Sequence, residues 1–208
     1  MQKILSMTFS EIGLNKNLQK AIADLGFETP TPIQQESIPY LLENETDLIA
    51  LAQTGTGKTA AFGLPVLHKV KVDRKLPQAI ILAPTRELCL QITKDMGTFS
   101  KYIKGLKITA VYGGASIVPQ MRDLKSGTQV VVGTPGRVID LIKRKALRLQ
   151  DIEFVVLDEA DEMLNMGFKD DLDTILAETP DEKQTLLFSA TMPKEVMRLS
   201  RNYMNSPK

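Results

Sequence analysis

Long apolar runs, tryptophan and paired cysteines are all missing from this sequence of 208 residues. The longest apolar runs are strand-sized, well below the roughly 18 residues that a membrane span needs, which excludes a transmembrane segment. Cys89 is the only cysteine, and residues 1–6 lack the apolar stretch of a signal peptide, so we expect a reducing, cytoplasmic compartment and no membrane partner. With 26 Lys and Arg against 25 Asp and Glu, any nucleic-acid site must be a local one.

Six short apolar runs recur along the chain, at 47–51, 79–82, 107–111, 129–132, 154–157 and 185–188. Stretches with helical spacing lie between them, for example Leu88, Ile92 and Met96. Alternation of strands and helices predicts an α/β fold with a parallel sheet. The first 45 residues differ, because Leu14, Leu18, Ala21, Ile22 and Leu25 form one helical stripe and Thr31-Pro32 is typical of a helix start. We therefore expect a helical segment over 1–45, an α/β domain over 46–205 and the start of a linker at 206–208.

A phosphate-binding loop is predicted directly after the first apolar run. Its residues are Ala52, Gln53, Thr54, Gly55, Thr56, Gly57, Lys58 and Thr59, and a helical stretch follows. Glycines let backbone N–H groups face the phosphates, a lysine reaches the β and γ phosphates, and a threonine hydroxyl ligates Mg²⁺. Ala52 departs from the general pattern, which has glycine there. The alternative is an ordinary turn between strand and helix, but the intact Gly57-Lys58-Thr59 favours ATP and Mg²⁺.

An acidic box, Asp158-Glu159-Ala160-Asp161, follows the run at 154–157. The carboxyl edge of a parallel sheet is where ligands bind. We expect Asp158 to hold Mg²⁺ partly through water and Glu159 to orient and deprotonate the attacking water, with Lys58 as the third catalytic residue. Acidic residues at a helix start also serve as caps. The phosphate-binding loop upstream favours hydrolysis over capping. That loop alone positions neither the cation nor the attacking water, and the two carboxylates of the acidic box would complete the site.

These motifs, in this order, resemble the DEAD-box RNA helicase family, whose name the acidic box spells. The segment from Gly26 to Gln34, with Phe9 ahead of it, is similar to the family's adenine-recognising Q motif, in which we assign Phe9, Phe27, Thr29 and Gln34 to nucleotide binding. A glutamine amide offers a donor and an acceptor to adenine, and an aromatic ring stacks on the base. The alternative is a proline turn followed by a surface amide.

Three further segments resemble the family's RNA-contacting motifs: Pro84-Thr85-Arg86, Gly113-Gly114 and Thr134-Pro135-Gly136-Arg137. Helix starts, hydroxyls and arginines bind phosphate oxygens, which predicts contact with the RNA backbone without sequence specificity. Each segment has an alternative interpretation. Thr85 could be a helix cap, Arg86 could form an internal ion pair and Gly113-Gly114 could be a plain turn. Arg137 could be a solvated surface arginine. Ser189 and Thr191, with Asp161, resemble the coupling motif, although two hydroxyls at a strand end also suit a helix cap.

The resemblance implies a RecA-like P-loop NTPase fold, a three-layer sandwich with helices on both faces of the sheet. It implies an ATP-dependent RNA helicase of which this chain is the N-terminal half, with a second RecA-like domain in cis as its partner. We expect the isolated chain to be monomeric, to bind ATP, to hydrolyse it very slowly and to unwind nothing. A P-loop ATPase that remodels DNA or protein and a non-enzymatic RNA clamp are the alternatives.

Overall fold

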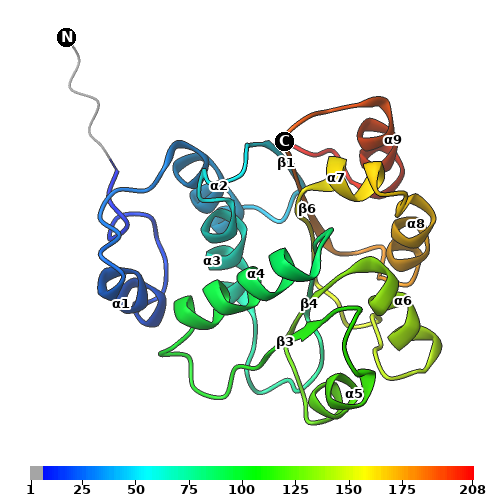
Figure 1. Cartoon of the computed structure of the whole chain (residues 1–208). Coiled ribbons are helices and arrows are strands. Elements are labelled where there is room, and N and C mark those ends of the chain that lie inside the picture. Colours follow the sequence, from blue (N-terminus) through cyan, green and yellow to red (C-terminus); the bar gives the residue numbers. More distant parts are fainter. Residues whose placement is uncertain (1–6) are drawn as a thin grey trace.

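A computed structural model describes residues 7–208; residues 1–6, on which the expected lack of a signal peptide rested, lie outside the described residues. The order of elements alternates between helix and strand through most of the chain (Figure 1). The helices are α1 (Lys16–Asp24), α2 (Pro32–Glu43), α3 (Lys58–Lys69), α4 (Arg86–Phe99), α5 (Ile117–Lys125), α6 (Pro135–Lys143), α7 (Ala160–Asn165), α8 (Lys169–Ala177) and α9 (Lys194–Tyr203). The strands are β1 (Leu48–Leu51), β2 (Ala79–Leu82), β3 (Ile108–Val111), β4 (Val130–Gly133), β5 (Phe154–Leu157) and β6 (Gln184–Ser189).

The six strands form one parallel sheet in the order β1-β6-β5-β2-β4-β3. The apolar runs therefore predicted every strand to within about one residue at each end. Asp47, Lys107 and Gln129, which the sequence placed inside strands, lie just before them. The Asp47 carboxylate and the Gln129 side-chain oxygen accept hydrogen bonds from the backbone N–H groups of Thr185 and Lys107, respectively, so both side chains join neighbouring strand ends instead.

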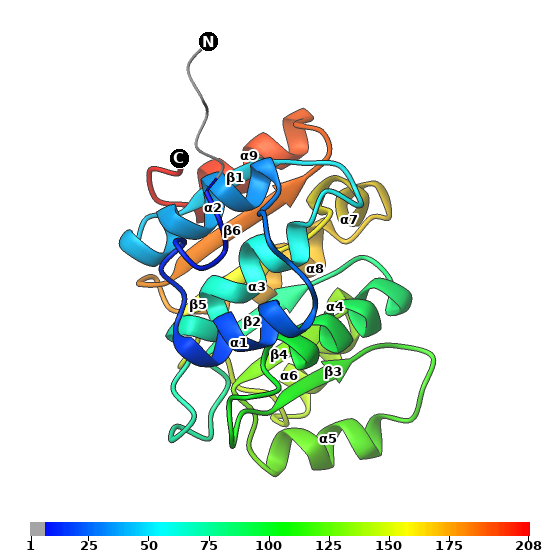
Figure 2. The ribbon, with the colours of Figure 1, turned by 90° about the vertical axis from the view of Figure 1, so that its left-hand side faces the viewer.

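Successive side chains of the central strands enter two separate apolar cores. In β5, Phe154 and Val156 contribute to one core and Val155 and Leu157 to the other. The first core also contains side chains from α1 to α4, and the second contains side chains from α5 to α9. This is the expected three-layer α/β architecture: in Figure 1 the strands lie between α1–α4 and α6–α9, and Figure 2 looks onto the sheet from the side of α1–α4. Strands covered on both faces must be apolar on both.

The N-terminal helices belong to the first core rather than to a separate one. Phe9, Leu18 and Ile38 are buried together with Phe62 of α3 and Phe188 of β6. The predicted stripe of α1 is buried at Leu14, Leu18, Ala21 and Ile22, but Leu25 is 39% exposed because the helix ends there. The N-terminal segment is thus packed where α2 can contact α3, directly behind the predicted phosphate-binding loop.

Residues at the other end of the described chain return to the sheet. The Asp47 carboxylate accepts a hydrogen bond from the N–H of Asn205 at 2.6 Å. The backbone of Lys208 bonds to Asp47 and Ile49, beside the free edge of β1. Residues 206–208, predicted to start a linker, therefore lie along the edge strand. In the described range 7–208, no helix is both long and apolar enough to cross a bilayer.

Candidate nucleotide and RNA site

The predicted phosphate-binding loop connects β1 to α3. Gly55 and Gly57 have φ of 83° and 90°, conformations that glycine adopts without strain, and Lys58 begins α3. Lys58 is 6% exposed, and its Nζ has no hydrogen-bond partner within the described chain. A buried ammonium with free N–H groups at a helix start is the chemistry that a phosphate group satisfies, so these residues fit a nucleotide phosphate chain.

Two side chains of the predicted Q motif hold this loop from behind. The Thr31 hydroxyl donates to the carbonyl of Thr56 at 2.9 Å, and Gln34 Nε2 donates to the carbonyl of Gly57 at 3.0 Å. Gln34 Oε1 accepts from the N–H of Thr31 at 2.9 Å, which makes a capping box at the start of α2. The Gln34 amide therefore keeps one N–H and one lone pair for a ligand. Its role in bracing the loop was not predicted, because no local pattern indicates a contact between residues 34 and 57.

Two aromatic rings stand at the outer end of the same region. Phe9 is buried and Phe27 is 41% exposed, with ring centroids 6.1 Å apart and planes inclined at 31°. The backbone N–H of Phe9 donates to the carbonyl of Glu28, which fixes the chain before α1 against the Q motif. An exposed ring beside a buried one offers a surface on which a flat base can stack.

The acidic box lies opposite Lys58. Lys58 Nζ is 3.5 Å from Asp158 Oδ1 and 3.9 Å from Glu159 Oε1, and the Thr54 hydroxyl donates to Glu159 Oε1 at 2.9 Å. Burial raises the pKa of Asp158 to about 6, although the charge of Lys58 favours its ionised form. Glu159 has φ of 53°, a strained conformation for a residue with a side chain, and such strain is found at functional positions.

The protein supplies only part of a coordination shell for Mg²⁺. Among the described residues, no three His, Cys, Asp or Glu side chains form a cluster that could hold a metal. Thr59, at the start of α3, and Asp158 both line the cavity beside Lys58. Two protein oxygens leave most of an octahedral shell to water and phosphate, which is how Mg²⁺ is usually bound at nucleotide sites.

A cavity of about 860 Å³ joins these parts. Predicted nucleotide or catalytic residues that line it are Phe9, Phe27, Thr29, Gln34, Thr54, Gly55, Gly57, Lys58, Thr59, Asp158 and Glu159. Ala52, Gln53 and Thr56, also predicted, do not line it, and Thr56 uses its hydroxyl to donate to the carbonyl of Gln53.

One wall of the cavity was missed by the sequence reasoning. It consists of α4 side chains, Leu88, Gln91, Asp95, Thr98 and Phe99. These positions recur at intervals of three and four residues, which marks one face of a helix, but that spacing alone did not indicate what the face lines. Gln91 donates to Asp95 at 2.7 Å, so the polar part of the wall is tied together.

The predicted coupling residues meet the acidic box. The Asp161 carboxylate accepts from the Thr191 hydroxyl at 2.7 Å and from the Thr191 N–H at 2.9 Å, and the Ser189 hydroxyl accepts from the Asp161 N–H at 3.3 Å. Burial alone would raise the pKa of Asp161, but the hydrogen bonds from Thr191, Ser189 and Ala190 together outweigh it and lower that pKa. The hydroxyls therefore bind the acidic box rather than cap α9, which begins after Pro193 without a side-chain cap.

The three predicted RNA segments lie together, because they follow the adjacent strands β2, β4 and β3. The Arg86 guanidinium lies over the Tyr112 ring, 4.9 Å from its centroid, next to Gly113-Gly114. The Thr85 hydroxyl accepts from the N–H of Leu88 and so caps α4, as one alternative held. Arg86 is exposed and appears in none of the ion pairs found among residues 7–208.

Arg137 is half-buried rather than a solvated surface residue. Its guanidinium donates to Gln120 Oε1 and to the carbonyl of Ala115, each at 2.9 Å. Gln120 also bonds to both backbone groups of Tyr112. Arg137 thus supports the loop from Tyr112 to Ser116, and it keeps further N–H groups because a guanidinium has five. Thr134, Pro135 and Gly136 form the start of α6 beside it, and Pro84 is buried at the end of β2.

Comparison with known proteins gives a consistent result. The model of the DEAD/DEAH box helicase family matches residues 31–199. ATP-dependent RNA helicase DeaD of Haemophilus influenzae is 52% identical over 201 residues, which are 97% of this chain and 33% of that protein. ATP-dependent RNA helicase CshA of Listeria monocytogenes is 54% identical over 199 residues, 96% of this chain and 38% of that protein. The chain therefore spans little more than a third of the length of these curated relatives.

Solved structures agree on the fold. A DEAD box protein from the hyperthermophile Methanococcus jannaschii superposes with a TM-score of 0.93 at 46% identity, over 97% of this chain and 55% of that one. The yeast DEAD-box splicing factor Prp28 superposes with a TM-score of 0.89 at 34% identity, over 96% of this chain and 50% of that one. The expected RecA-like α/β fold is confirmed by these matches.

Proposed function

Because the chain belongs to the DEAD/DEAH box helicase family, we propose that it is the nucleotide-binding part of an ATP-dependent RNA helicase. One observation carries the proposal. The Lys58 ammonium is buried without a hydrogen-bond partner in the described residues, at the inner end of a cavity that also contains Asp158 and Glu159. A cation at the start of α3, with two carboxylates from the segment before α7 at 3.5 and 3.9 Å from it, supplies the groups that phosphoryl transfer to water requires.

In the proposed complex, adenine occupies the outer end of the cavity. Phe27 and Phe9 supply the aromatic surface, and the unused N–H and lone pair of Gln34 face the base edge. Thr29 lines the same end, and residues 52–59 enclose the phosphates. Gln34 then contacts both the base and the phosphate-binding loop, so binding of the base would affect the conformation of that loop.

For hydrolysis, Glu159 orients the attacking water and accepts its proton. In the described conformation the Thr54 hydroxyl and Lys58 hold this carboxylate. Phosphate oxygens offer Lys58 better partners than a carboxylate at 3.9 Å, which releases Glu159 for the water. Mg²⁺, bound through Thr59 and Asp158, would neutralise charge that develops on the phosphates.

RNA is proposed to bind across the carboxyl ends of β2, β4 and β3. Arg86, the exposed backbone of Gly113-Gly114 and the free N–H groups of Arg137 present donors that suit phosphate oxygens, and phosphate contacts carry no sequence information. Binding is therefore independent of sequence.

The bonds from Asp161 to Ser189 and Thr191 connect the acidic box to β6, and we assign them to coupling between the nucleotide state and the closure of a second RecA-like domain. A cytoplasmic location and a monomeric state remain predictions from the sequence.

The test is ATP turnover as a function of RNA concentration for a protein that extends this chain through the length of its relatives. We expect RNA-dependent turnover that Glu159→Gln lowers by about 10² to 10⁴ while ATP still binds, because only the general base is removed. Glu162→Gln, an exposed residue of the same α7, is the matched control and should retain activity. Equal stimulation by DNA of the same sequence would indicate another P-loop remodeller, and binding without turnover would indicate a clamp.

A further inference from the structure

A second basic region lies at the opposite end of the strands that carry the RNA motifs. Segments 70–78, 100–107 and 117–129 contain eight Lys and Arg but only two acidic residues, Asp73 and Asp123. The chain as a whole has a formal charge of +1. The excess of positive charge is therefore local, and its position has to be explained by the fold.

Gln129 binds these segments to one another. Its side chain donates to the carbonyls of Val72 and Arg74 and accepts from the N–H of Lys107. Lys107 Nζ donates to the carbonyl of Ser126 at 3.1 Å, just after α5. In both ribbon views the two loops and α5 lie along the lower edge of the molecule (Figures 1 and 2).

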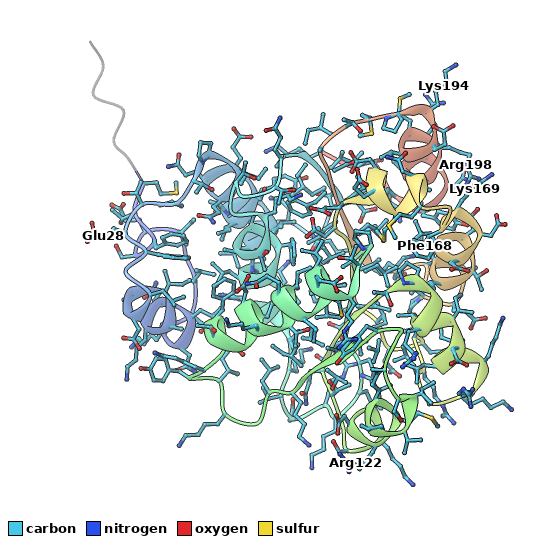
Figure 3. The ribbon with its side chains drawn as sticks, in the orientation of Figure 1. Glu28, Arg122, Phe168, Lys169, Lys194 and Arg198 are labelled. Atoms are coloured by element: carbon cyan, nitrogen blue, oxygen red, sulfur yellow. The ribbon has the colours of Figure 1, made fainter. Side chains whose placement is uncertain are left out.

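Two of the eight cations are neutralised. Arg74 pairs with Asp151 and Glu153, and Lys101 pairs with Asp24. The remaining six are exposed, and we call them the basic end: Lys71, Lys75, Lys104, Lys107, Arg122 and Lys125. Arg122 has only the adjacent Asp123 nearby, at 3.8 Å, and its side chain points away from the domain (Figure 3).

A groove connects the basic end to the RNA motifs. It has a volume of about 720 Å³ and runs between the edge strand β3 and α5. Tyr112, Ala115 and Ser116 line one end, next to Gly113-Gly114 and Arg137, and Lys107, Asp123 and Ser126 line the other. The nine residues of α5 span about 13 Å between these ends. Ile108, Ala110 and Pro119 make the middle of the groove apolar.

We propose that single-stranded RNA flanking the motif-bound segment follows this groove to the basic end. The inference rests on the proposed RNA-binding function and extends its path. Positive charge at the exit suits a phosphate backbone, and the Tyr112 ring and the apolar side chains of the groove offer surface to unpaired bases. Single-strand grooves likewise combine a basic track with aromatic side chains on which bases stack. An acidic peptide would also be attracted to the cations, but the proposed function puts RNA, and no peptide, at the other end of the groove.

The experiment compares RNA binding by the described chain and by a Lys104→Glu, Arg122→Glu, Lys125→Glu triple variant. These side chains are exposed, and only Arg122 has a described partner, so the fold should persist, which thermal unfolding checks. Two RNAs are titrated at several salt concentrations. One is a short single strand, and the other is the same strand extended by further single-stranded nucleotides at either end. A Lys16→Glu, Lys143→Glu, Arg201→Glu variant changes the net charge equally on α1, α6 and α9 and is the control.

We expect the triple variant to lose affinity for the flanked RNA alone. The slope of log K against log salt should fall by about 2, since each phosphate contact to a single strand contributes about 0.7. Equal binding of flanked RNA by the triple and control variants overturns the inference. If polyglutamate binds the unsubstituted chain and the control but not the triple variant, the basic end is assigned to an acidic partner instead. If Arg86→Gln with Arg137→Gln, which removes both charges but keeps amide donors, also leaves RNA binding intact, the proposed function itself fails; if that pair abolishes binding, only the flank path is wrong.

Discussion

Gly57 has two separate reasons to be glycine, and Gly55 has one. Both have positive φ, but a Cβ at Gly57 would collide with the Gln34 amide, whereas a Cβ at Gly55 meets nothing within 4 Å. Substitution at Gly55 therefore adds backbone strain alone. At Gly57 it also displaces the side chain that braces the phosphate-binding loop.

We predict that Gly55→Ala lowers the free energy of unfolding by about 1–2 kcal/mol, the cost of the left-handed conformation. Gly57→Ala should lower it by that amount and by about 1 kcal/mol more for each hydrogen bond that Gln34 loses. Urea unfolding of the two variants measures the difference. Equal losses would show that Gln34 does not hold the loop.

Gln34 and Arg137 each combine a structural role with the role predicted from sequence. Gln34 braces the phosphate-binding loop, and Arg137 supports the loop that contains Gly113-Gly114. Each keeps hydrogen-bonding groups for a ligand. Loss of either side chain is therefore expected to affect both the fold nearby and binding, so that a conservative replacement is more informative than alanine.

At the scale of elements, β1 links the nucleotide site to the end of the described chain. The strand leads into the phosphate-binding loop, and Asp47, just before it, accepts from the N–H groups of Thr185 and Asn205, each at 2.6 Å. The carboxylate is 2% exposed. Burial raises its pKa, while the two N–H groups favour the ionised form. The path of the chain after α9 is thus held by this side chain together with the backbone hydrogen bonds of Lys208.

Asp47→Asn leaves one acceptor oxygen for two donors. We predict a loss of about 1–3 kcal/mol in the free energy of unfolding, since a buried N–H remains unsatisfied. Hydrogen exchange at the amides of Asn205 and Lys208 should accelerate as well. Asp73→Asn, at an exposed loop position, is the matched control for charge. An unchanged exchange rate at Asn205 would contradict the anchoring role.

Helix α4 shows how an element acquires a role through packing. Its buried face, with Cys89, Ile92 and Met96, follows from helical spacing. Burial raises the pKa of the Cys89 thiol to about 12, which agrees with packing rather than catalysis. The adjoining face forms a wall of the proposed nucleotide cavity because Phe9 and the Q motif, which follows α1, line the same cavity.

In the whole molecule, the sheet order separates two functions. The phosphate-binding loop, the coupling residues and the acidic box follow β1, β6 and β5, which are neighbours in the sheet. The RNA segments follow β2, β4 and β3, which are neighbours in the other half. The strands β5 and β2 pair at the centre, so Asp158 and Pro84 follow directly paired strands. The proposed nucleotide and RNA sites are therefore adjacent but distinct.

The isolated chain is predicted to bind ATP and to turn it over very slowly. An arginine from a second domain is worth about 10³ or more in rate to related phosphoryl transfers, and the family resemblance assigns such arginines to the second RecA-like domain. We expect RNA-stimulated turnover of this chain to be at least about 10³ below that of the longer protein. Steady-state ATPase assays of both, with and without RNA, measure it. Comparable rates would show that the described domain contains a complete active site.

The strands and the family could be predicted from the sequence, and the phosphate-binding loop and the acidic box could be proposed from it, because each depends on residues close together in the chain. A run such as Phe154–Leu157 is apolar at every position, and Gly57-Lys58-Thr59 is a local pattern. Three contacts are seen only in the folded chain: Gln34 braces the loop, α4 lines the cavity and Arg137 donates to the carbonyl of Ala115. Those contacts join segments that are distant in sequence, and the order of the strands in the sheet, which spacing along the chain does not encode, brings them together.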